Sequence, residues 1–544
     1  MTAKTELEIE GMHCDGCETT VGAALSRAGL TEVRVDWRRG TATGLPSAGF
    51  TIESAAEQVA ATGYKLVEAP AEDARPVAAT DEYDLVIIGS GSGAFAAAIK
   101  ARELGARVAM VERDLVGGTC VNIGCVPSKA LLRAAELFWK AGHSPFAGVE
   151  TTATNVDLRS LVAQKNAIVA KLRKEKYEDL LTHYEIDLIR GSATFVGRDT
   201  VAVAGRSLKG FRFLIATGAA PWVPPIEGID TIDYLTSTSA LELEAVPGEL
   251  IVVGANAIGL ELGQLFVHLG SKVTFVEALE RVAPFEEPEI SAAIDTHLRS
   301  QGAVIHTGAS ITRAGVADGR VWLDIGSRDG AVRLEADRVL MATGRRARTA
   351  DLGLDLAGVE TDPRGQVMVN DSLQSSNDRI YAVGDVTNHP QFVYVAALGG
   401  NIAAENAIRG TSRKIDFTTM PRVTFTTPAI ASVGLTEEQA REAGKKVITS
   451  VLPIDVVPRA IVDHETGGLV KLVADETSGQ LLGAHIIADG AGDVIQAAVM
   501  ALKYRATIEE IASTYHPYLT MAEALKLAAQ GFNKDISMLS CCAA

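Results

Sequence analysis

The stretch Tyr83-Asp-Leu-Val-Ile-Ile-Gly-Ser-Gly-Ser-Gly-Ala94 decides the fold of most of this chain. Its apolar half predicts a buried strand, and its glycines allow a tight turn where a pyrophosphate can approach backbone N–H groups at a helix N-terminus. A helical pattern then reaches Leu104, and a second strand over 107–111 ends at Glu112, whose carboxylate can bind ribose hydroxyls. The stretch therefore predicts a dinucleotide-binding unit with Gly89, Gly91 and Ala94 in its turn.

The same pattern returns near the middle of the chain. A strand over 250–253 leads into Gly254-Ala-Asn-Ala-Ile-Gly259, and a helix and a strand that ends at Glu277 follow. Asn256 replaces the middle glycine, and because Asn tolerates left-handed backbone angles we expect the turn to survive. An ordinary strand–helix–strand crossover without a ligand is the alternative. An Ala-Thr-Gly tripeptide follows each copy, so two dinucleotide sites are predicted, with these tripeptides ending at Gly218 and Gly344.

Length and composition narrow the class of protein. The chain has 544 residues, enough for about three or four domains, and its 47% hydrophobic and 22% charged residues exclude whole-chain disorder. The formal net charge of −17 repels phosphate backbones, so nucleic acid is not an expected partner. The first residues lack the layout of a signal peptide, and no apolar run reaches the roughly 18 residues of a membrane span. We therefore expect a cytoplasmic protein without membrane insertion.

The six cysteines are sparse, yet they form three close pairs. A secreted disulfide scaffold would carry a denser set, so the pairing favours redox or soft-metal chemistry. The pairs are Cys14 with Cys17, Cys120 with Cys125, and Cys541 with Cys542.

The middle pair lies in the most specific segment, Gly117-Gly-Thr-Cys-Val-Asn-Ile-Gly-Cys-Val-Pro-Ser-Lys129. Two cysteines with this spacing at the mouth of a helix can close a disulfide, and the helix N-terminus is expected to lower the pKa of both thiols. Two buried structural cysteines are the alternative, which the surrounding Gly, Pro and Lys residues disfavour.

These features, together with Ile380-Tyr-Ala-Val-Gly-Asp385, resemble the FAD-dependent pyridine nucleotide disulfide oxidoreductases over about residues 83–532. The resemblance implies an α/β protein with two Rossmann-like dinucleotide-binding domains, an α+β dimerisation domain, and a homodimer whose subunits share the active site. NAD(P)H would reduce FAD, and FAD would reduce a cystine in which Cys120 is the interchange thiol and Cys125 lies beside the flavin. The further FAD contacts that it implies are Asp385, Ala94, Glu112, Thr119, Lys129, Ala193 and Val393.

Two consequences of the resemblance concern cofactor and domain boundaries. The family implies NADPH, whereas Glu277 would bind a ribose hydroxyl and repel a 2′-phosphate, which favours NADH. The predicted domains are an FAD-binding domain over 83–235 and 376–415, an NAD(P)H-binding domain over 236–375, and a dimerisation domain with a Cys-Cys tail over 416–544. Within the last domain, helices are expected over 493–504 and 521–530.

The N-terminal 68 residues predict a small, separate ferredoxin-like domain. Its βαββαβ pattern has strands over 7–9, 31–37, 41–45 and 64–67 and helices over 19–28 and 52–61, and a tether over 69–82 follows. Gly11-Met-His-Cys-Asp-Gly-Cys17 would place two thiolates on an exposed loop, where they can grip a soft cation, and it resembles the heavy-metal-associated domains. A redox pair is the alternative, but the element order is not that of thioredoxin.

The terminal pair completes the pattern. A bridge between the adjacent Cys541 and Cys542 would be strained and easily reduced, which leaves a dithiol, although a chance pair is the alternative. With all three pairs, the chain resembles those members of the family that reduce Hg(II), which small thiols deliver as a chelate. The resemblance implies transfer from the N-terminal pair to the tail pair of the partner subunit and then to the middle pair. Tyr177 and Tyr518 match tyrosines that flank the ion, with packed aromatics as the alternative.

One departure separates the chain from the glutathione and lipoamide members. There a carboxylate stands five residues after the His of a His-Pro pair, whereas here Met521 has that place after His516, and Glu523 lies two residues further. The departure favours a metal substrate over a disulfide. A lipoamide dehydrogenase-like or glutathione reductase-like enzyme fused to a metal-binding domain is the alternative. A non-enzymatic alternative is metal storage by the N-terminal domain, but it leaves most of the chain without a role.

Overall fold

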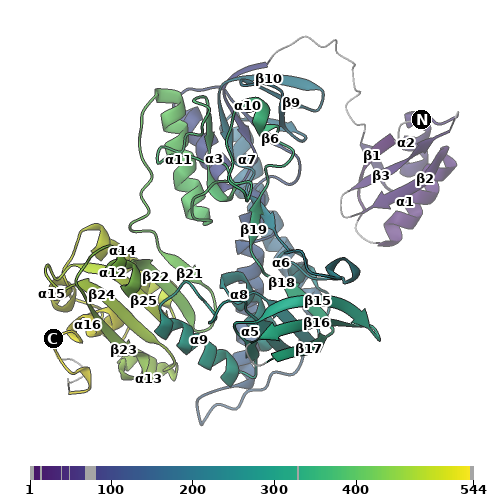
Figure 1. Ribbon diagram of the computed structural model, residues 1–544. Coiled ribbons are helices and arrows are strands. Elements are labelled where there is room, and N and C mark those ends of the chain that lie inside the picture. Colours follow the sequence, from purple (N-terminus) through teal and green to yellow (C-terminus); the bar gives the residue numbers. More distant parts are fainter. Residues whose placement is uncertain are drawn as a thin grey trace. The chain divides into compact units, whose positions relative to one another are not determined.

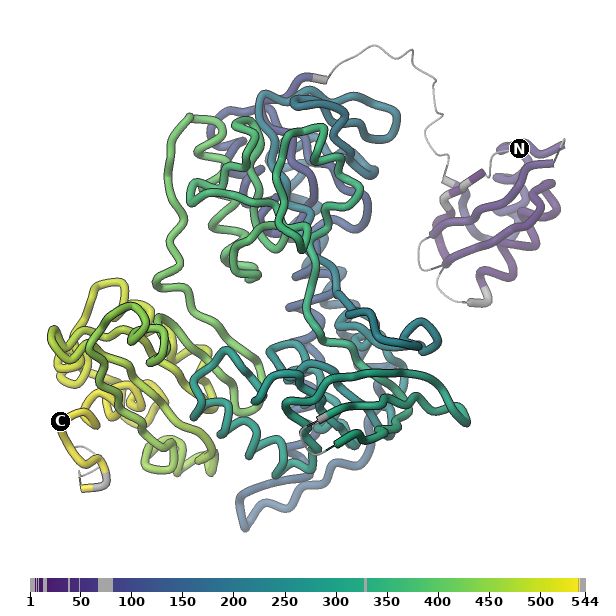
Figure 2. Tube along the Cα trace, viewed as in Figure 1, coloured from purple at the N-terminus to yellow at the C-terminus, as the bar shows by residue number. Residues whose placement is uncertain are grey.

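The computed structural model describes residues 5–12, 15–37, 40–47, 49–67, 81–327 and 330–538, and it divides into two compact units, Met1–Ala79 and Thr80–Ala544 (Figures 1 and 2). Cys14, Cys541, Cys542 and nearly all of the predicted tether lie outside the described residues. Among the residues that are described, no helix combines the length and apolarity that crossing a membrane requires.

The first unit has the expected order of elements. These are β1 (Thr5–Glu10), α1 (Asp15–Arg27), β2 (Leu30–Asp36), β3 (Thr41–Pro46), α2 (Ile52–Ala60) and β4 (Lys65–Val67). The strands form one antiparallel sheet in the order β2-β3-β1-β4. Because α1 begins earlier than predicted, Cys17 lies inside the helix and is only 5% exposed. The prediction of an exposed loop is therefore wrong for Cys17, which packs with Met12 in this unit's apolar core.

The second unit begins with the sheet that the opening stretch predicts. β5 (Asp81–Ile88) starts two residues before the expected strand, so the tether is shorter than predicted. The sheet has the order β7-β6-β5-β10-β9-β8, and β20 also pairs with β10. Its strands are β6 (Val108–Glu112), β7 (Asp187–Arg190), β8 (Thr194–Phe195), β9 (Thr200–Val203), β10 (Arg206–Ile215) and β20 (Ile380–Ala382). Its central strands are parallel and almost fully buried, as expected of a sheet covered on both faces.

Helices flank this sheet and lead away from it. α3 (Ser92–Glu103) and α11 (Val393–Arg409) pack closely because Gly400 lets the backbone of Gly93 approach, and Figure 1 shows the two helices side by side. The segment between β6 and β7 contains α4 (Gly118–Asn122), α5 (Cys125–Gly142), α6 (Leu158–Arg173), the π-helical turn η1 (Lys174–Glu178) and α7 (Asp179–His183).

The second copy of the pattern builds a parallel sheet in the order β14-β13-β12-β18. Its elements are β12 (Glu249–Val253), α8 (Ala257–His268), β13 (Lys272–Val276), α9 (Pro288–Ser300), β14 (Val304–His306) and β18 (Arg338–Met341). A three-stranded antiparallel sheet is inserted before β18 and comprises β15 (Ser310–Ala317), β16 (Arg320–Ser327) and β17 (Gly330–Ala336). The remaining short elements before the last module are η2 (Ile229–Thr231), η3 (Ser239–Glu242), α10 (Leu354–Ala357) and η4 (Gly384–Val386), of which α10 and η4 pack with the first sheet.

The two Ala-Thr-Gly tripeptides are joined to each other. β11 (Ala219–Pro221) follows the first, β19 (Arg345–Ala347) follows the second, and the two short strands pair antiparallel. The Thr217 hydroxyl donates to the carbonyl of Arg348 at 2.8 Å, and the Thr343 hydroxyl donates to the carbonyl of Trp222 at 2.6 Å. Each threonine therefore stabilises the crossing of the chain between the two dinucleotide-binding sheets.

The last module has an antiparallel sheet in the order β21-β22-β25-β24-β23. Two of its helices were predicted, with boundaries that differ by two residues at most. Its strands are β21 (Arg422–Thr424), β22 (Ala429–Gly434), β23 (Val447–Pro453), β24 (Leu469–Asp475) and β25 (Leu481–Ala488). Its helices are α12 (Glu437–Glu442), η5 (Ile454–Val456), α13 (Pro458–Asp463), α14 (Ala491–Lys503), α15 (Ile508–Ser513), α16 (Glu523–Gln530) and η6 (Ile536–Met538).

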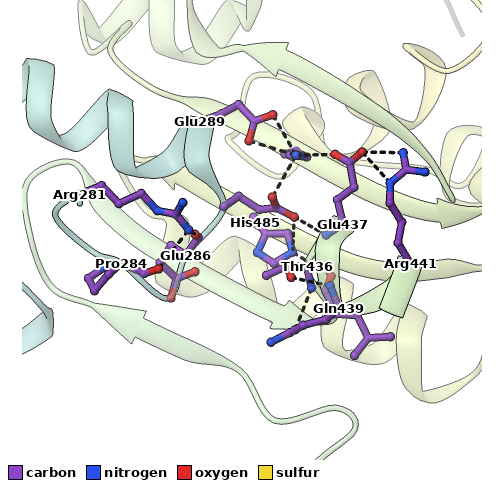
Figure 3. Close-up of polar contacts among 12 residues, drawn as sticks. Arg281, Pro284, Glu286, Glu289, Thr436, Glu437, Gln439, Arg441 and His485 are labelled. Carbon is purple, nitrogen blue, oxygen red and sulfur yellow. Dashed lines mark hydrogen bonds and ion pairs between the residues drawn. The ribbon is translucent and has the colours of Figure 1, made fainter. Parts of the chain in front are cut away.

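A buried charge cluster docks the second dinucleotide-binding sheet onto this module (Figure 3). Lys471 on β24 is 2% exposed, and its Nζ lies 3.0 Å from a carboxylate oxygen of Glu287 and 2.9 Å from one of Glu289. Burial opposes the charge of Lys471, but the hydrogen bonds to these carboxylates raise its pKa. A buried charge is tolerated only with such partners. The cluster comprises Glu286, Glu287, Glu289, Arg422, Glu437, Lys471 and His485.

Candidate active site

The first glycine turn presents bare backbone at the N-terminus of α3. Gly89 has a φ of +106°, and a Cβ there would lie 2.4 Å from the carbonyl oxygen of Ala216. Gly118 has a φ of +65°, and a Cβ there would lie 2.5 Å from the Cα of Gly91. Only glycine fits both positions, and the resulting cradle of N–H groups suits the pyrophosphate of a dinucleotide such as FAD.

One hydrogen-bonded group ties this turn to the acidic residue and to the loop that leads to the cysteines. The Ser90 hydroxyl donates to Glu112 Oε2 at 2.5 Å, and the N–H of Asp114 donates to Glu112 Oε1 at 2.8 Å. The N–H of Gly117 donates to the Ser90 carbonyl at 3.0 Å. Ser90 is 1% exposed and was not predicted as a site residue, although its place between two turn glycines was a signal.

The two cysteines of the middle pair come together and differ in acidity. Cys120 lies in the short α4 and Cys125 begins α5, and both are free cysteines. A hydrogen bond from Cys120, aided by the Lys129 charge, lowers the pKa of Cys125 to about 7. The same hydrogen bond, together with burial, raises the pKa of Cys120. The prediction that both thiols are acidified is wrong for Cys120, because only Cys125 begins a long helix and Cys120 holds the shared proton.

Lys129 lies one helical turn after Cys125 and forms an ion pair with α8. Its Nζ is 2.6 Å from Glu261 Oε2, and the Glu261 side chain is only 9% exposed. The Lys129 charge acts to lower the pKa of both cysteines, although for Cys120 the hydrogen bond and burial outweigh it. Glu261 acts in the opposite direction on Cys125. Glu261 was not predicted, although a single acidic residue in the apolar run of α8 was a signal.

Tyr177 lies close to the segment that carries the cysteines, and a Cβ on Gly117 would lie 3.3 Å from its ring. It lies in η1, with its hydroxyl 3.5 Å from the Ser92 hydroxyl and its ring edge-on to Phe95 at 5.0 Å. Burial raises the pKa of Tyr177, and the charges of Cys120 and Cys125 act in the same direction. π-helical turns inside longer helices often occur at functional sites. Tyr518 lies on the last module between α15 and α16 and is 54% exposed.

Asp385 faces a buried cation that the sequence did not reveal. Asp385 lies in η4, and its Oδ2 is 3.6 Å from Arg345 Nε. Burial raises the pKa of Asp385 despite this cation, and burial lowers the pKa of Arg345. A weak electrostatic interaction with Cys125 acts in the opposite direction on Arg345. The remaining predicted FAD contacts lie as follows: Thr119 in α4, Ala193 buried between β7 and β8, and Val393 at the start of α11.

The second glycine turn is tighter than the first. Gly254 has a φ of +95°, and a Cβ on Gly259 would lie 1.8 Å from the carbonyl oxygen of Gly254. Asn256 has a φ of −101° and a ψ of −170°, close to the extended backbone of Gly91 in the first turn. The turn is retained as expected, but without a left-handed Asn256, because the first glycine of each turn, not the middle residue, takes the positive φ.

Glu277 holds the second turn from inside. It is 7% exposed, and its two carboxylate oxygens accept hydrogen bonds from the N–H groups of Ala255 at 2.7 Å and Leu279 at 2.9 Å. Gly344, at the end of the neighbouring tripeptide, has a φ of +112°, and Gly218 in the first copy has a φ of +66°. Both positions require glycine-like backbone freedom beside a predicted cofactor site.

His516 lies between α15 and α16, and Glu523 begins α16. The ring Nδ1 of His516 lies 3.0 Å from the carbonyl oxygen of Thr514. Glu523, the residue two places beyond Met521, is 8% exposed, and among the described residues its Oε2 has no hydrogen-bond partner. Burial raises the pKa of Glu523, while the His516 charge acts in the opposite direction, so the two groups interact.

Comparisons with known proteins agree with this geometry. Residues 83–400 match the family model of pyridine nucleotide-disulphide oxidoreductases, and residues 420–529 match the dimerisation domain of that family. The chain is 50% identical over 544 residues to a mercuric reductase of Staphylococcus aureus, covering 99% of each chain. It is 50% identical to a mercuric reductase of Streptomyces lividans, covering 85% of this chain and 98% of the other. The HOCl-induced flavoprotein disulfide reductase RclA of Escherichia coli is a similar structure, with a TM-score of 0.75, 32% identity, and coverage of 82% of this chain and 99% of that chain.

Proposed function

The chain belongs to the mercuric reductases of the pyridine nucleotide-disulphide oxidoreductase family, and on this premise we propose that it reduces Hg(II) to Hg(0) with NAD(P)H. The reaction transfers two electrons: NAD(P)H and Hg(II) give NAD(P)⁺, a proton and Hg(0). The observation that carries the proposal is the pair Cys120 and Cys125, which lies beside a dinucleotide cradle and includes a thiol with a pKa of about 7. Thiolates are the ligands that a soft ion such as Hg(II) prefers.

The family implies FAD and a pyridine nucleotide, and the backbone at the first turn fits the FAD pyrophosphate. FAD, when bound, supplies a two-electron carrier between the nucleotide and the thiols. Asp385 and Lys129 would contact it, as the resemblance to the family implies. The other residues that would hold FAD are Gly89, Gly91, Ala94, Glu112, Thr119, Ala193, Gly218 and Val393.

The two thiols have different tasks when the metal ion arrives. Cys125 is ready as a thiolate near neutral pH, whereas Cys120 keeps the shared proton until the ion replaces it. Tyr177 lies beside the pair and would flank the ion. In the proposed homodimer, Cys541 and Cys542 of the partner subunit receive Hg(II) from small thiols and pass it to this pair, and Tyr518 of the partner subunit flanks the ion.

The second turn would bind the pyridine nucleotide through Gly254, Gly259 and Gly344. Glu277 is buried there and accepts two backbone hydrogen bonds, so its negative charge stays beside the turn. A fixed carboxylate at this place repels the 2′-phosphate of NADPH. We therefore expect NADH to be used at least as well as NADPH, in contrast to the usual preference of the family.

The N-terminal unit would capture metal through Cys14 and Cys17 without being required for catalysis. The Streptomyces lividans relative matches 98% of its own length with only 85% of this chain, so a protein of that name exists without a counterpart to the rest. Deletion of residues 1–68 is expected to leave the activity of the purified enzyme largely intact, because the glycine turns and the pair Cys120 and Cys125 lie in the other unit.

The decisive experiment is anaerobic oxidation of NADH and NADPH in the presence of Hg(II) and excess small thiol, with volatile Hg(0) measured. Lipoamide and glutathione disulfide serve as alternative substrates, because a lipoamide dehydrogenase-like or glutathione reductase-like enzyme is the alternative function. The Cys541→Ala and Cys542→Ala double variant is expected to lose turnover with thiol-chelated Hg(II). Turnover with a disulfide alone would contradict the proposal, and full activity of the double variant would remove the tail from the transfer route.

A further inference from the structure

One residue contacts both members of the Lys129–Glu261 ion pair, and it comes from a distant part of the chain. Phe425 follows β21, and its backbone N–H donates to Glu261 Oε1 at 2.9 Å. The ammonium of Lys129 lies over its ring, with Nζ 4.5 Å from the ring centroid. Phe425 is 47% exposed, so packing in an apolar core does not account for an aromatic ring at this position.

Helix α8 fixes the place of this ring. Gln264, one helical turn after Glu261, donates from Nε2 to the carbonyl of Thr427 at 2.6 Å, and its Oε1 accepts from the N–H of Thr427 at 2.7 Å. The two side chains thus pair with alternate residues of an extended segment, as a neighbouring strand would. Both are buried, at 7% and 1% exposure, so these hydrogen bonds are costly to leave unmade. The ring of Phe425 is therefore held where Lys129 can use it.

We propose that Phe425 is a positioning residue that keeps the Lys129 ammonium beside the Cys120 and Cys125 pair, an inference that rests on the proposed function of that pair. Lys129 stands one helical turn after Cys125, so its charge reaches the thiols only while the side chain stays on that side of α5. An aromatic face attracts the ammonium but not the neutral amine. Phe425 therefore acts through Lys129 rather than by contact with the metal ion.

The test compares two variants in the FAD-loaded full chain. Phe425→Leu removes the ring and keeps the backbone N–H, whereas Phe425→Tyr keeps the ring. Mass spectrometry measures how fast an amine-acylating reagent labels Lys129 before any metal is added, because only the neutral amine reacts. We expect labelling about three- to tenfold faster in Phe425→Leu and unchanged in Phe425→Tyr. The proposal would be overturned if Lys129 in Phe425→Leu were labelled at the wild-type rate, or if Lys129 were labelled equally fast in both variants.

Phe211→Leu is the matched control. Phe211 is also exposed, and the Arg212 guanidinium lies over its ring at 4.2 Å from the centroid. It differs from Phe425 because it lies in β10. The labelling rate of Lys129 should be unchanged in Phe211→Leu. A change as large as that in Phe425→Leu would overturn the proposal.

Turnover gives a second readout. The kcat for Hg(II) reduction should fall about three- to tenfold in Phe425→Leu with an unchanged KM for the nucleotide. A raised KM with unchanged labelling would contradict the positioning role. Wild-type enzyme that released no Hg(0) would contradict the proposed function but leave the labelling result valid, so the two failures are distinguishable.

Discussion

The two dinucleotide-binding units share a strand, a glycine turn, a helix and an acidic residue, but they use the next segment differently. In the first unit, the segment after Glu112 turns at Gly117 into the short helices that carry the cysteine pair. In the second, the segment after Glu277 runs to Glu287, which enters the buried charge cluster of the last module. The strand, turn and helix that the two units share suit nucleotide binding. The segment that follows them holds the cysteine pair in the first unit and the docking residue Glu287 in the second.

The turns themselves differ in how tightly they close. Glu112 reaches its turn through a side chain, the Ser90 hydroxyl, whereas Glu277 accepts directly from the backbone N–H of Ala255. The first turn has room for Ala94, while the equivalent Gly259 leaves no space for a Cβ. The second turn is therefore more sensitive to substitution than the first. Substitutions in the turns and in the segments that follow them should reveal both differences between the units.

The docking segment should show the largest effect. Lys471→Met leaves Glu287 buried without its cation and is expected to lower the free energy of unfolding by about 3–5 kcal/mol. An unpaired buried carboxylate has a raised folded pKa, so its penalty grows as pH rises above the unfolded pKa. The loss, measured by urea unfolding, should therefore be greater at pH 8 than at pH 5.

Arg441 provides the control in the same region, because it pairs with Glu437 but its side chain is 57% exposed. Arg441→Met should cost less than about 1 kcal/mol. Similar small losses in both variants would mean that the buried charges do not carry the docking.

Substitution of the third turn residue comes next. Gly259→Ala forces a Cβ against the Gly254 carbonyl and should slow reduction of the flavin by NAD(P)H by about a hundredfold, roughly 2.7 kcal/mol in the barrier. Flavin content and reduction by dithionite should be unchanged, since the first turn is intact. Ala94→Gly, the reverse change in the first turn, should cost only about 1 kcal/mol of stability. Normal NAD(P)H use by Gly259→Ala would show that the second turn is not the nucleotide site.

The acidic residues should separate the two cofactors with a smaller effect. Glu277→Gln weakens two hydrogen bonds to the turn and removes the charge that opposes a 2′-phosphate. We expect the KM for NADH to rise about tenfold, and less for NADPH, because hydrogen bonds to a charged group contribute about 1.5–3 kcal/mol. Glu112→Gln should instead lower FAD retention. Steady-state kinetics and flavin absorbance measure these effects, and equal changes for both nucleotides would contradict the role of the Glu277 charge.

The smallest effect concerns the thiols that only the first unit carries. The pKa of about 7 means that alkylation of Cys125 should rise with pH and reach half its maximum near pH 7. From pH 7 to 8 the rate should increase only about twofold, because most of the thiol is already ionised. Lys129→Met should move the half-maximum to higher pH, and peptide mapping after timed alkylation checks both results. A half-maximum near that of a free cysteine would contradict the arrangement.

Local sequence patterns correctly predicted the features that depend on residues close together in the chain. Periodicity and turn chemistry account for the strand that ends at Glu112, the strand that ends just before Glu277, the glycines of both turns and the element order of the first unit. One error fell where burial decides, since α1 begins early enough to place Cys17 in a core. The other concerned the backbone, since Asn256 is extended and Gly254 takes the positive φ. A sequence pattern does not show which side chains a helix start will bury.

Contacts between distant segments were beyond prediction. Glu261 and Phe425 reach Lys129 from other parts of the chain, Arg345 likewise reaches Asp385, and no motif marks these residues. Met521 stands where the disulfide-reducing members of the family carry a carboxylate, and the sequence did not show that Glu523, two residues further, is only 8% exposed.

By itself, the sequence determined that this protein has two dinucleotide turns and a cysteine pair directly after the first, because spacing and glycine placement are local properties of the chain. Only the tertiary structure decided that Cys125 rather than Cys120 is the acidic thiol, and that Lys129 is held between Glu261 and Phe425. Acidity and charge placement depend on burial and on groups that meet through space, and these are fixed when the chain folds.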